Sequence, residues 1–177
     1  MKKYDEPAVS VMDSPLGPLT LVAATTGLRE VHFGDHAPAR AADIGGGGVA
    51  SATDRRAAAI IARARQQLAE YFAGARRTFD LPLVPQGTSF QLAAWRVLRG
   101  IPYGETITYG EQAKRIGRPS AARAAGAANG RNPLAIVVPC HRVVGAGGRL
   151  VGFGGGLAAK RFLIDLEAAV VDRNGAG

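Results

Sequence analysis

The sequence predicts two domains, an α/β domain with an antiparallel sheet over residues 1–87 and a mainly α-helical domain over residues 88–177. Three observations predict this arrangement. Short apolar runs separated by turn residues fill the first part of the chain, which is typical of strands. Apolar residues at helical spacing dominate the second part. Between the two lies Pro85-Gln86-Gly87, a break of the kind found in turns and linkers.

The expected N-terminal strands cover residues 9–12, 19–23 and 28–33, and turn residues separate them. Three such strands in succession predict an antiparallel meander. Residues 34–53 include four consecutive glycines, Gly45 to Gly48, and the remaining residues are mostly small. This composition predicts a mobile loop.

One helix is expected after this loop, from Asp54 to about Gly74. Its apolar residues recur at helical spacing, at Ile60, Ile61, Ala64, Leu68 and Phe72. Residues 79–84 predict one further strand before the domain boundary. The N-terminal domain is therefore expected to be a small antiparallel sheet with one long helix.

Capping patterns mark the helix starts of the C-terminal domain. Thr88 and Gln91 have the spacing of a capping box, and so do Thr108 and Glu111. The first pair is expected to open a helix that glycine and proline residues end, and the second to open a shorter one. Ser120 is expected to cap the helix after that.

Two short helices joined by a tight turn, over residues 109–117 and 121–128, are typical of a helix-turn-helix motif. The alternative is an ordinary helical hairpin. The second helix is almost all alanine, and Arg123 is its only long side chain. Because alanine buries little apolar area, such a helix fits a close approach to DNA better than it fits the filling of a core.

The charge of the chain is unevenly placed. The whole chain has a net charge of +8, and residues 88–177 alone have twelve Lys/Arg against five Asp/Glu, a net of +7. Such a local excess of cations favours a polyanionic partner, most simply nucleic acid, over a merely solubilising surface. No apolar run approaches the ~20 residues of a membrane span, and the N-terminus does not resemble a secretory signal.

The chain has one cysteine, Cys140, inside an apolar segment over residues 134–144 that predicts a mostly buried strand. A lone cysteine forms no internal disulfide and no cysteine metal cage, and together with the missing signal it favours a cytoplasmic protein. His141 and Arg142 follow it directly. These neighbours fit a thiol with tuned reactivity, while a small inert buried residue is the alternative.

A final helix is expected over residues 157–170. Its predicted buried stripe consists of Ala159, Phe162, Leu163, Leu166 and Val170. Glu167 borders this stripe, so its carboxylate is either an ordinary solvated group or partly buried beside a polar partner.

Several motifs of the C-terminal half occur together and in a fixed order. They are Ile101-Pro102-Tyr103-Gly104, Asn129-Gly130-Arg131-Asn132-Pro133, Pro139-Cys140-His141-Arg142-Val143 and the segment from Gly155 to Glu167. In these motifs the chain resembles the methylated-DNA–protein-cysteine methyltransferases (O6-alkylguanine-DNA alkyltransferases). The resemblance is clear over residues 88–167 and looser over 71–83. It implies a ribonuclease-H-like N-terminal domain and a C-terminal domain with a winged-helix-like helix-turn-helix.

The resemblance also implies a reaction, the transfer of an alkyl group from O6 of guanine, and also from O4 of thymine, in duplex DNA to Cys140. In the family a relay of cysteine, water, histidine and glutamate activates the sulfur, which corresponds here to Cys140, His141 and Glu167. Asn132 matches an asparagine that braces the site, although an asparagine before proline is equally a simple turn residue. Adjacent strand residues face opposite sides, which independently favours a bridging water over direct contact of Cys140 and His141.

By the same resemblance the helix over residues 121–128 enters the minor groove, and Arg123 fills the gap left by an extruded base. Tyr109 matches a tyrosine that contacts the phosphate beside the target and donates a hydrogen bond to the base; an aromatic residue packed on the core is the alternative. The remaining implied DNA contacts are Gly110, Arg118 and Ala146. The implied pocket for the base is lined by Val143, Phe153, Gly154 and Gly155.

The chain departs from its relatives in the pocket wall. Phe153 stands where many have tyrosine, and Gly154 stands where they have alanine or serine, which is expected to enlarge the pocket. Some relatives bind zinc in the N-terminal domain. With only His32 and His36 there and no second cysteine, we expect no metal.

No phosphate loop or dinucleotide motif is present in the sequence, and we expect no cofactor. A thioether product is stable, so each molecule is expected to act once. The expected partner is double-stranded DNA containing O6-alkylguanine, bound by a monomer, with cooperativity on DNA left open. Two other functions are weighed, a non-reactive alkyltransferase-like module that binds DNA lesions and, less favoured, a cysteine hydrolase.

Overall fold

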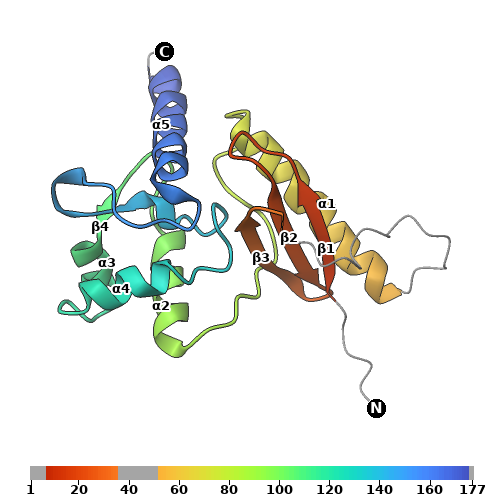
Figure 1. Cartoon of the computed structure of the whole chain (residues 1–177), viewed down its shortest axis with the longest axis horizontal. Helices are drawn as coiled ribbons and strands as arrows, with labels where there is room; N and C mark the ends of the chain where they lie inside the picture. The colour runs from red at the N-terminus through yellow and green to blue at the C-terminus, as the bar shows by residue number, and fades with distance from the viewer. Residues whose placement is uncertain (1–6, 36–51, 176–177) are drawn as a thin grey trace. The chain divides into compact units, whose positions relative to one another are not determined.

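The computed structural model describes residues 7–35 and 52–175 (Figure 1). The chain divides into two compact units, Met1–Pro85 and Gln86–Gly177, and each has a core of its own. None of the helices in the described part is long and apolar enough to cross a membrane.

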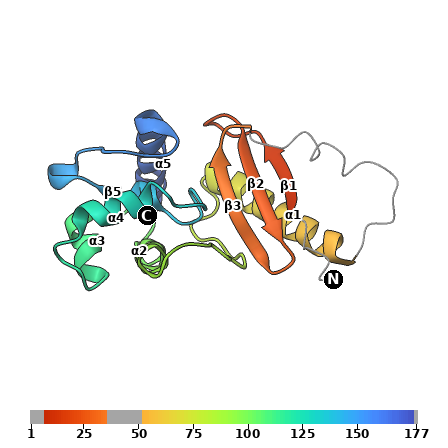
Figure 2. The same ribbon diagram turned by 60° about the horizontal axis from the view of Figure 1, so that its bottom comes forward.

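The N-terminal unit is a three-stranded sheet packed against one helix. The strands are β1 (Ala8–Met12), β2 (Leu19–Ala24) and β3 (Gly27–Phe33), paired antiparallel in the order β1-β2-β3. Helix α1 (Ala52–Phe72) lies across one face of this sheet, as Figures 1 and 2 show. Buried leucines of β2 and β3 and the fully buried Leu68 and Tyr71 of α1 form its core. The predicted meander and long helix are confirmed.

The strand predicted over residues 79–84 is wrong. That segment makes a single parallel bridge, Leu28 to Leu83. The amide of Leu28 donates to the carbonyl of Pro82 at 2.8 Å, and the amide of Val84 donates to the carbonyl of Leu28 at 3.0 Å. Because Pro82 has no N–H to donate, the pairing does not extend into a strand. Of the loop predicted over 34–53, residues 36–51 lie outside the described part.

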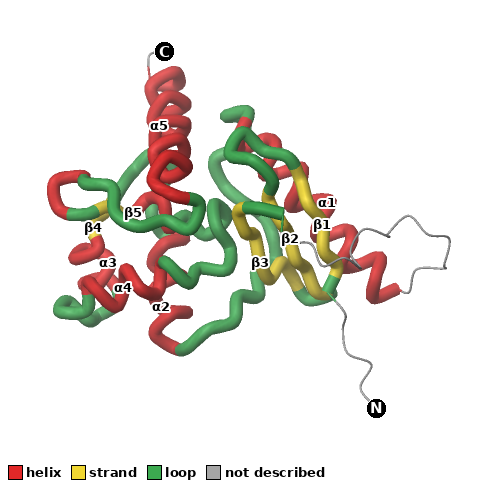
Figure 3. Tube along the Cα trace, viewed as in Figure 1, coloured by secondary structure: helices red, strands yellow, loops and turns green. Residues whose placement is uncertain are grey.

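The C-terminal unit is built mainly from helices, which Figure 3 shows in red. They are α2 (Ser89–Arg99), α3 (Tyr109–Arg115), α4 (Ala122–Asn129) and α5 (Gly156–Gly175), joined by a short parallel pairing of β4 (Ile107–Thr108) with β5 (Val143–Val144). The predicted mainly helical character of this half is confirmed.

The predicted helix starts differ in how fully they are capped. Thr88 and Gln91 form a complete capping box on α2, each side chain bonded to the backbone of the other residue. On α3 the Thr108 hydroxyl accepts from the amide of Glu111 at 3.1 Å. The carboxylate of Glu111 pairs instead with Arg115, one turn further along. The first capping box is therefore confirmed, and the second is present only in its Thr108 half.

Helix α4 is held by its neighbours rather than by the predicted cap. Its N-cap is Ala121, without a side-chain hydrogen bond, so the prediction of a Ser120 cap is wrong. The buried amides of Gln112 on α3 and Asn129 on α4 bond to each other reciprocally at 2.9 and 2.8 Å. The indole of Trp95 donates to the carbonyl of Ala128 at 2.9 Å. These buried bonds fix α4 against α2 and α3.

The strand predicted over residues 134–144 is also wrong. Cys140–Arg142 form one turn of 3₁₀-helix, and only Val143–Val144 pair as a strand. Before this turn, the backbone curls through local bonds, including the amide of Val138 to the carbonyl of Leu134 at 2.8 Å. Pro139 lacks an N–H and does not support a ladder. The apolar run reflects burial of an irregular segment, which a strand pattern alone does not distinguish.

The buried stripe of α5 differs from the prediction at two residues, Phe162, which is exposed, and Leu166, which is only half-buried. Phe162 is 37% exposed, while Lys160 is completely buried. Ala159, Leu163 and Val170 are buried as predicted. Glu167 is also buried, so of the two alternatives for its carboxylate the solvated one is wrong.

Candidate active site

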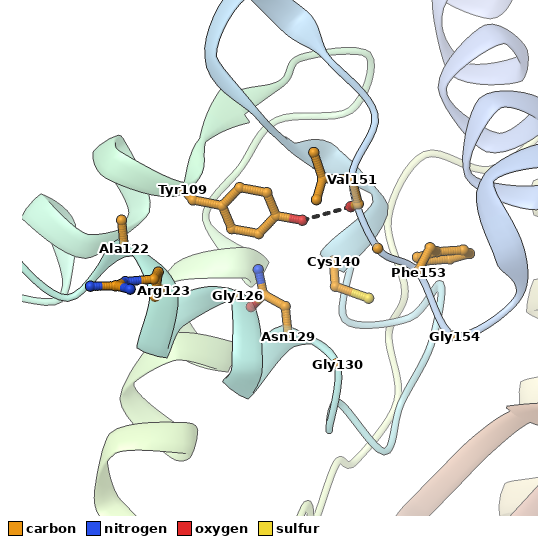
Figure 4. A pocket seen from close by; sticks show the side chains of 11 residues that line it. Tyr109, Ala122, Arg123, Gly126, Asn129, Gly130, Cys140, Val151, Phe153 and Gly154 are labelled. Carbon is orange, nitrogen blue, oxygen red and sulfur yellow. Dashed lines mark hydrogen bonds between the residues drawn. The ribbon is translucent and has the colours of Figure 1, made fainter.

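Cys140 opens the 3₁₀ turn and is only 6% exposed. Its side chain borders a cavity of about 530 Å³, shown in Figure 4. The other lining residues come from α3, from α4 with the residue that follows it, and from the segment before α5: Tyr109, Ala122, Arg123, Gly126, Asn129, Gly130, Val151, Gly152, Phe153 and Gly154. The cysteine is therefore buried in the fold yet reaches a space large enough for a planar ligand.

Asn132 braces the cysteine turn. Its side-chain amide donates to the sulfur of Cys140 at 3.3 Å and to the carbonyl of Val138 at 2.7 Å. Its side-chain oxygen accepts from the amide of Leu134 at 3.0 Å. The asparagine is thus a turn residue and a contact of the sulfur at once.

The surroundings of Cys140 keep its thiol protonated at rest. Burial raises the pKa of Cys140, and the hydrogen bond from Asn132 and the charge of Lys160 oppose that rise only in part. A thiol is a weak nucleophile compared with its thiolate. Reaction at this sulfur therefore needs a base that removes the proton.

His141 is fully buried next to the cysteine, and its ring nitrogen Nε2 lies 2.7 Å from Oε1 of Glu167. Burial lowers the pKa of His141, against the opposing effect of the Glu167 carboxylate. The imidazole is therefore neutral near neutral pH. Because a carboxylate only accepts hydrogen bonds, Nε2 carries the proton and Nδ1 is the nitrogen that can take up another.

Glu167 is an ionised carboxylate inside the protein. Burial alone raises its pKa, but the bonds and charges of His141 and Arg142 outweigh burial and hold the pKa at about 2. Its Oε2 also accepts from the backbone amide of Gly104 at 3.0 Å. Such a carboxylate orients the imidazole and stabilises it when it becomes charged.

Arg142 is a part of this cluster that the sequence interpretation left without a role. Its guanidinium donates to both oxygens of Glu167, at 2.9 and 3.0 Å, and to the carbonyl of Ile101 at 2.6 Å. It also lies 5.5 Å from the ring centre of Tyr103. In the sequence, only its position directly after Cys140 and His141 pointed to a role for Arg142 at the site. That position does not predict which residue the guanidinium would bind.

Tyr109 lies at the first position of α3, on the wall of the cavity opposite the cysteine turn (Figure 4). Its ring packs over Gly126 of α4, where an added Cβ atom would lie 3.6 Å from the ring carbons, an ordinary van der Waals distance. Its hydroxyl donates to the carbonyl of Val151 at 2.9 Å. Burial and the nearby Cys140 raise the pKa of Tyr109, which keeps the phenol a proton donor.

The residues predicted to contact DNA lie along α3, α4 and the loop that precedes α5. Arg123 is exposed on α4 and extends away from Cys140 in Figure 4. Arg118 is exposed in the turn between α3 and α4. Gly110 follows Tyr109 on α3, and Ala146 begins a second 3₁₀ turn, Ala146–Gly148.

Two of the four residues predicted to line the base pocket border the cavity beside Cys140. Phe153 and Gly154 border the cavity, and the ring of Phe153 stands edge-on to His141 with centroids 6.4 Å apart. Within the described residues, Val143 and Gly155 are not among those that line it. Val143 is completely buried, and it pairs with Ile107 between β4 and β5.

Among the described residues no group of three or more His, Cys, Asp or Glu side chains is placed to hold a metal ion. His32 bonds to Glu30 at 2.7 Å. His36 lies outside the described residues.

Comparison with known proteins identifies both halves of the chain. Residues 8–85 match the family described as 6-O-methylguanine DNA methyltransferase, ribonuclease-like domain, and residues 89–169 match the DNA binding domain of the same description. A crystal structure of Mycobacterium tuberculosis O6-methylguanine methyltransferase is similar, with a TM-score of 0.76, 42% identity, and coverage of 92% of this chain and 93% of that one. The predicted fold class, with a ribonuclease-like domain before a helical one, is thereby confirmed.

Relatives of known name agree with this result. A methylated-DNA–protein-cysteine methyltransferase of Methanosarcina acetivorans is 45% identical over 90% of this chain and 97% of its own length. One from Mycobacterium bovis is 47% identical over 88% of this chain and 89% of its own. A crystal structure of Mycobacterium tuberculosis OGT in complex with DNA matches with a TM-score of 0.75, 44% identity, and coverage of 90% of this chain and 92% of that one. The resemblance in the motifs is confirmed, and the chain belongs to the methylated-DNA–protein-cysteine methyltransferase family.

Proposed function

We propose that this protein repairs alkylated DNA directly, by moving a methyl or other alkyl group from O6 of guanine, and also from O4 of thymine, to Cys140. The observation that carries the proposal is a lone cysteine on a cavity of about 530 Å³, backed by a buried histidine, glutamate and arginine. The names of its relatives and the DNA-bound structure of one similar protein support the same conclusion.

The reaction is a displacement at the alkyl carbon. A bond forms from that carbon to the sulfur of Cys140 while the bond from the carbon to O6 breaks, and the guanine leaves with the electron pair. The thiol proton passes through a bridging water to Nδ1 of His141, and Glu167 stabilises the resulting imidazolium. Asn132, which already donates to the sulfur, stabilises the thiolate as it forms.

Tyr109 assists the departure of the base by donating a hydrogen bond to it. Its hydroxyl donates to the carbonyl of Val151 in the structure, and both residues line the cavity. Entry of a base therefore requires the hydroxyl to exchange this acceptor for one on the base. The raised pKa of Tyr109 suits this role, because the phenol keeps its proton until the leaving base needs it.

The target atom is stacked inside a duplex, so the nucleotide must be rotated out, at a cost of a few kcal/mol. Helix α4 supports an approach to the minor groove, because its side chains are small and Arg123 alone projects. In our proposal Arg123 occupies the gap left by the extruded base. Gly110, Arg118 and Ala146 contact the DNA backbone on either side of it.

The thioether product is stable, so each protein molecule reacts once. Mixing the protein with a duplex containing O6-methylguanine is expected to add the mass of one methylene (a methyl replacing the thiol hydrogen) and no more. Intact-mass spectrometry with peptide mapping to Cys140 measures this. Addition of several groups, or turnover of many substrates per protein, contradicts the proposal.

The alternative is a module that binds lesions without reacting, and the raised pKa of the buried Cys140 is the observation in its favour. Such a module would retain the damaged duplex while its mass stays unchanged. The mass experiment therefore separates the two functions when it is paired with a binding titration of the same sample.

Replacing Arg123 by alanine is expected to slow transfer from a duplex by about ten- to a hundredfold. No side chain then occupies the gap that the extruded base leaves in the base stack. Reaction with the free base O6-benzylguanine should stay within about twofold, since no extrusion is needed. Single-turnover rates on both substrates measure the difference. Arg96→Ala, which removes one exposed charge from α2, is the matched control. Equal losses on the two substrates contradict a role of Arg123 in extrusion.

A further inference from the structure

Two buried side-chain amides lie at the α4 wall of the active-site cavity, and the proposed reaction does not yet use them. Gln112 of α3 is completely buried, and Asn129 of α4 is 8% exposed. Each donates to the side-chain oxygen of the other, at 2.9 and 2.8 Å. Two apolar side chains of the same shape would pack these helices about equally well, without the cost of burying polar groups. Packing of α3 on α4 therefore does not by itself account for the amides.

The neighbouring backbone fixes which way the two amides face. Nε2 of Gln112 also donates to the backbone carbonyl of Ala94, at 3.4 Å. Because a carbonyl only accepts hydrogen bonds, the atom that faces it is the nitrogen of Gln112 and not the oxygen. The oxygen of Gln112 then faces Asn129, so the atom of Asn129 that meets it is the nitrogen. The pair is thus held in one orientation.

Asn129 keeps one N–H that this pairing does not use. Gln112 spends both of its N–H groups, one on Ala94 and one on Asn129. The nitrogen of Asn129 has two hydrogens, and one of them bonds to Gln112. Within the described part of the chain, the side chain of Asn129 has no other hydrogen-bond partner. Asn129 lines the cavity, and in Figure 4 its side chain rises from α4 toward Tyr109.

The cavity offers a base few other polar side chains. Of the described residues that line it, the polar ones besides Asn129 are Tyr109, Arg123 and Cys140. The hydroxyl of Tyr109 donates to the carbonyl of Val151, and Arg123 extends away from the cysteine in Figure 4. Binding pockets gain specificity from a small number of precisely placed polar groups. The N–H of Asn129 is such a group, because Gln112 fixes its direction.

Alkylation changes the hydrogen bonding of one ring nitrogen in both proposed lesions. In guanine, N1 carries a hydrogen and donates, but in O6-alkylguanine that hydrogen is absent and N1 accepts. N3 of thymine changes in the same way when O4 is alkylated. A fixed N–H in the pocket can therefore bond to this nitrogen in the alkylated base. In the undamaged base it meets a second donor, and both are left unpaired, which costs binding free energy.

We propose that Asn129 is a specificity-determining residue, one whose remaining N–H donates to the ring nitrogen that alkylation leaves without a hydrogen, while Gln112 holds the amide in orientation. This inference rests on the proposed function. It explains why two amides occupy a buried position at the cavity wall. Once the departing base is protonated at that nitrogen, it no longer accepts the bond from Asn129, and release of the repaired base is favoured.

The variant Gln112→Leu/Asn129→Leu removes both amides and leaves neither partner buried without the other. Transfer from a duplex containing O6-methylguanine should slow by about five- to thirtyfold, because the base loses one hydrogen bond in the pocket. Alkylation of Cys140 by iodoacetamide involves no base, so its rate should stay within about twofold. Single-turnover rates measure the first effect, and intact mass over time measures the second.

A substrate that lacks the ring nitrogen tests the assignment at the level of one atom. O6-methyl-1-deazaguanine has a C–H in place of N1. Because this change also alters the leaving group, the comparison is made by equilibrium binding in the Cys140→Ser background, where no transfer occurs. The leucine pair should weaken binding of the O6-methylguanine duplex by about three- to tenfold and of the 1-deaza duplex by less than about twofold. A 7-deaza duplex keeps N1 and should show the full loss.

Two controls separate recognition from loss of packing. Gln67→Leu removes another buried amide, one that bonds to the backbone of Asp80 in the N-terminal unit, and should change none of these quantities. Urea unfolding of each variant gives the folded fraction to which rates and affinities are normalised. Gln112→Leu alone keeps the N–H of Asn129 but frees the amide to turn, so its loss should be smaller than that of the leucine pair.

The inference is overturned if the folded leucine pair keeps the natural rate on the O6-methylguanine duplex. It is also overturned if the pair weakens binding of the 1-deaza duplex as much as binding of the O6-methylguanine duplex, since the lost contact then does not involve N1. Failure of the natural chain itself to take up an alkyl group overturns the proposed function instead.

Discussion

Cys140→Ser is expected to abolish alkyl transfer completely while leaving binding to duplex DNA within about twofold of the natural chain. A serine hydroxyl does not ionise in this pH range, so the relay from His141 to Glu167 cannot generate the anionic nucleophile that a thiol provides. Cys140 is 6% exposed and faces the cavity, so it contributes nothing to the charged surface that meets phosphate. Intact mass and a fluorescence binding titration measure the two effects.

This variant is a clean test because the chain has one cysteine. Any adduct on Cys140→Ser must therefore come from a different nucleophile, which would contradict the assignment of the acceptor. The fold is expected to persist, since Asn132 donates to a hydroxyl as readily as to sulfur. Asn132→Ala is the companion variant. It removes the bond that opposes the raised pKa of the thiol, so it should slow transfer by about tenfold without changing DNA binding.

The sequence predicted the regular parts of this fold because their signals are local. The meander of β1 to β3, the long α1 and the capping box of Thr88 and Gln91 each depend on residues within a few positions of one another. The cysteine segment was assigned wrongly for the opposite reason. Its apolar residues are buried by the surrounding helices, and Pro139 and local backbone turns determine its path. Neither produces a regular spacing of apolar residues in the sequence.

The same distinction applies to the site. Cys140, His141 and Glu167 were identified through their motif, and the structure brings the last two within 2.7 Å of each other. Lys160 was missed and Arg142 was given no partner, because a single cation in a sequence is most simply a solvated one. Their partners lie far away along the chain: Tyr109 is 51 positions from Lys160, and Ile101 is 41 positions from Arg142. No pattern of neighbouring residues encodes such pairs.

Glu167→Gln is expected to lower both the stability of the C-terminal unit and the rate of transfer. It leaves the guanidinium of Arg142 buried without its counter-charge, at a cost of about 3–5 kcal/mol. It also removes the charge that stabilises the imidazolium of His141, which should slow transfer by about 10²- to 10⁴-fold. Urea unfolding followed by Trp95 fluorescence measures the first effect, and single-turnover transfer from the methylated duplex measures the second.

The pH dependence of stability offers an independent measurement. The pKa of Glu167 in the folded protein is about 2, below its ordinary value of 4.5, so its contribution is fully present above about pH 4.5 and is lost as the pH falls toward 2. The size of that contribution is roughly 3 kcal/mol. The lowered pKa of His141 acts in the same direction, because the unfolded chain takes up that proton first. The natural chain should therefore lose more stability in acid than Glu167→Gln does.

The double variant Arg142→Met/Glu167→Gln separates stability from chemistry. Replacing both charges removes the unpaired guanidinium, and a buried ion pair exchanged for a neutral pair is often nearly neutral for folding. Stability should therefore recover toward that of the natural chain, while the rate of transfer stays low because His141 still lacks its carboxylate. Recovery of the rate together with stability would show that Glu167 matters only as the counter-ion of Arg142. The proton relay through His141 would then need a different acceptor for its charge.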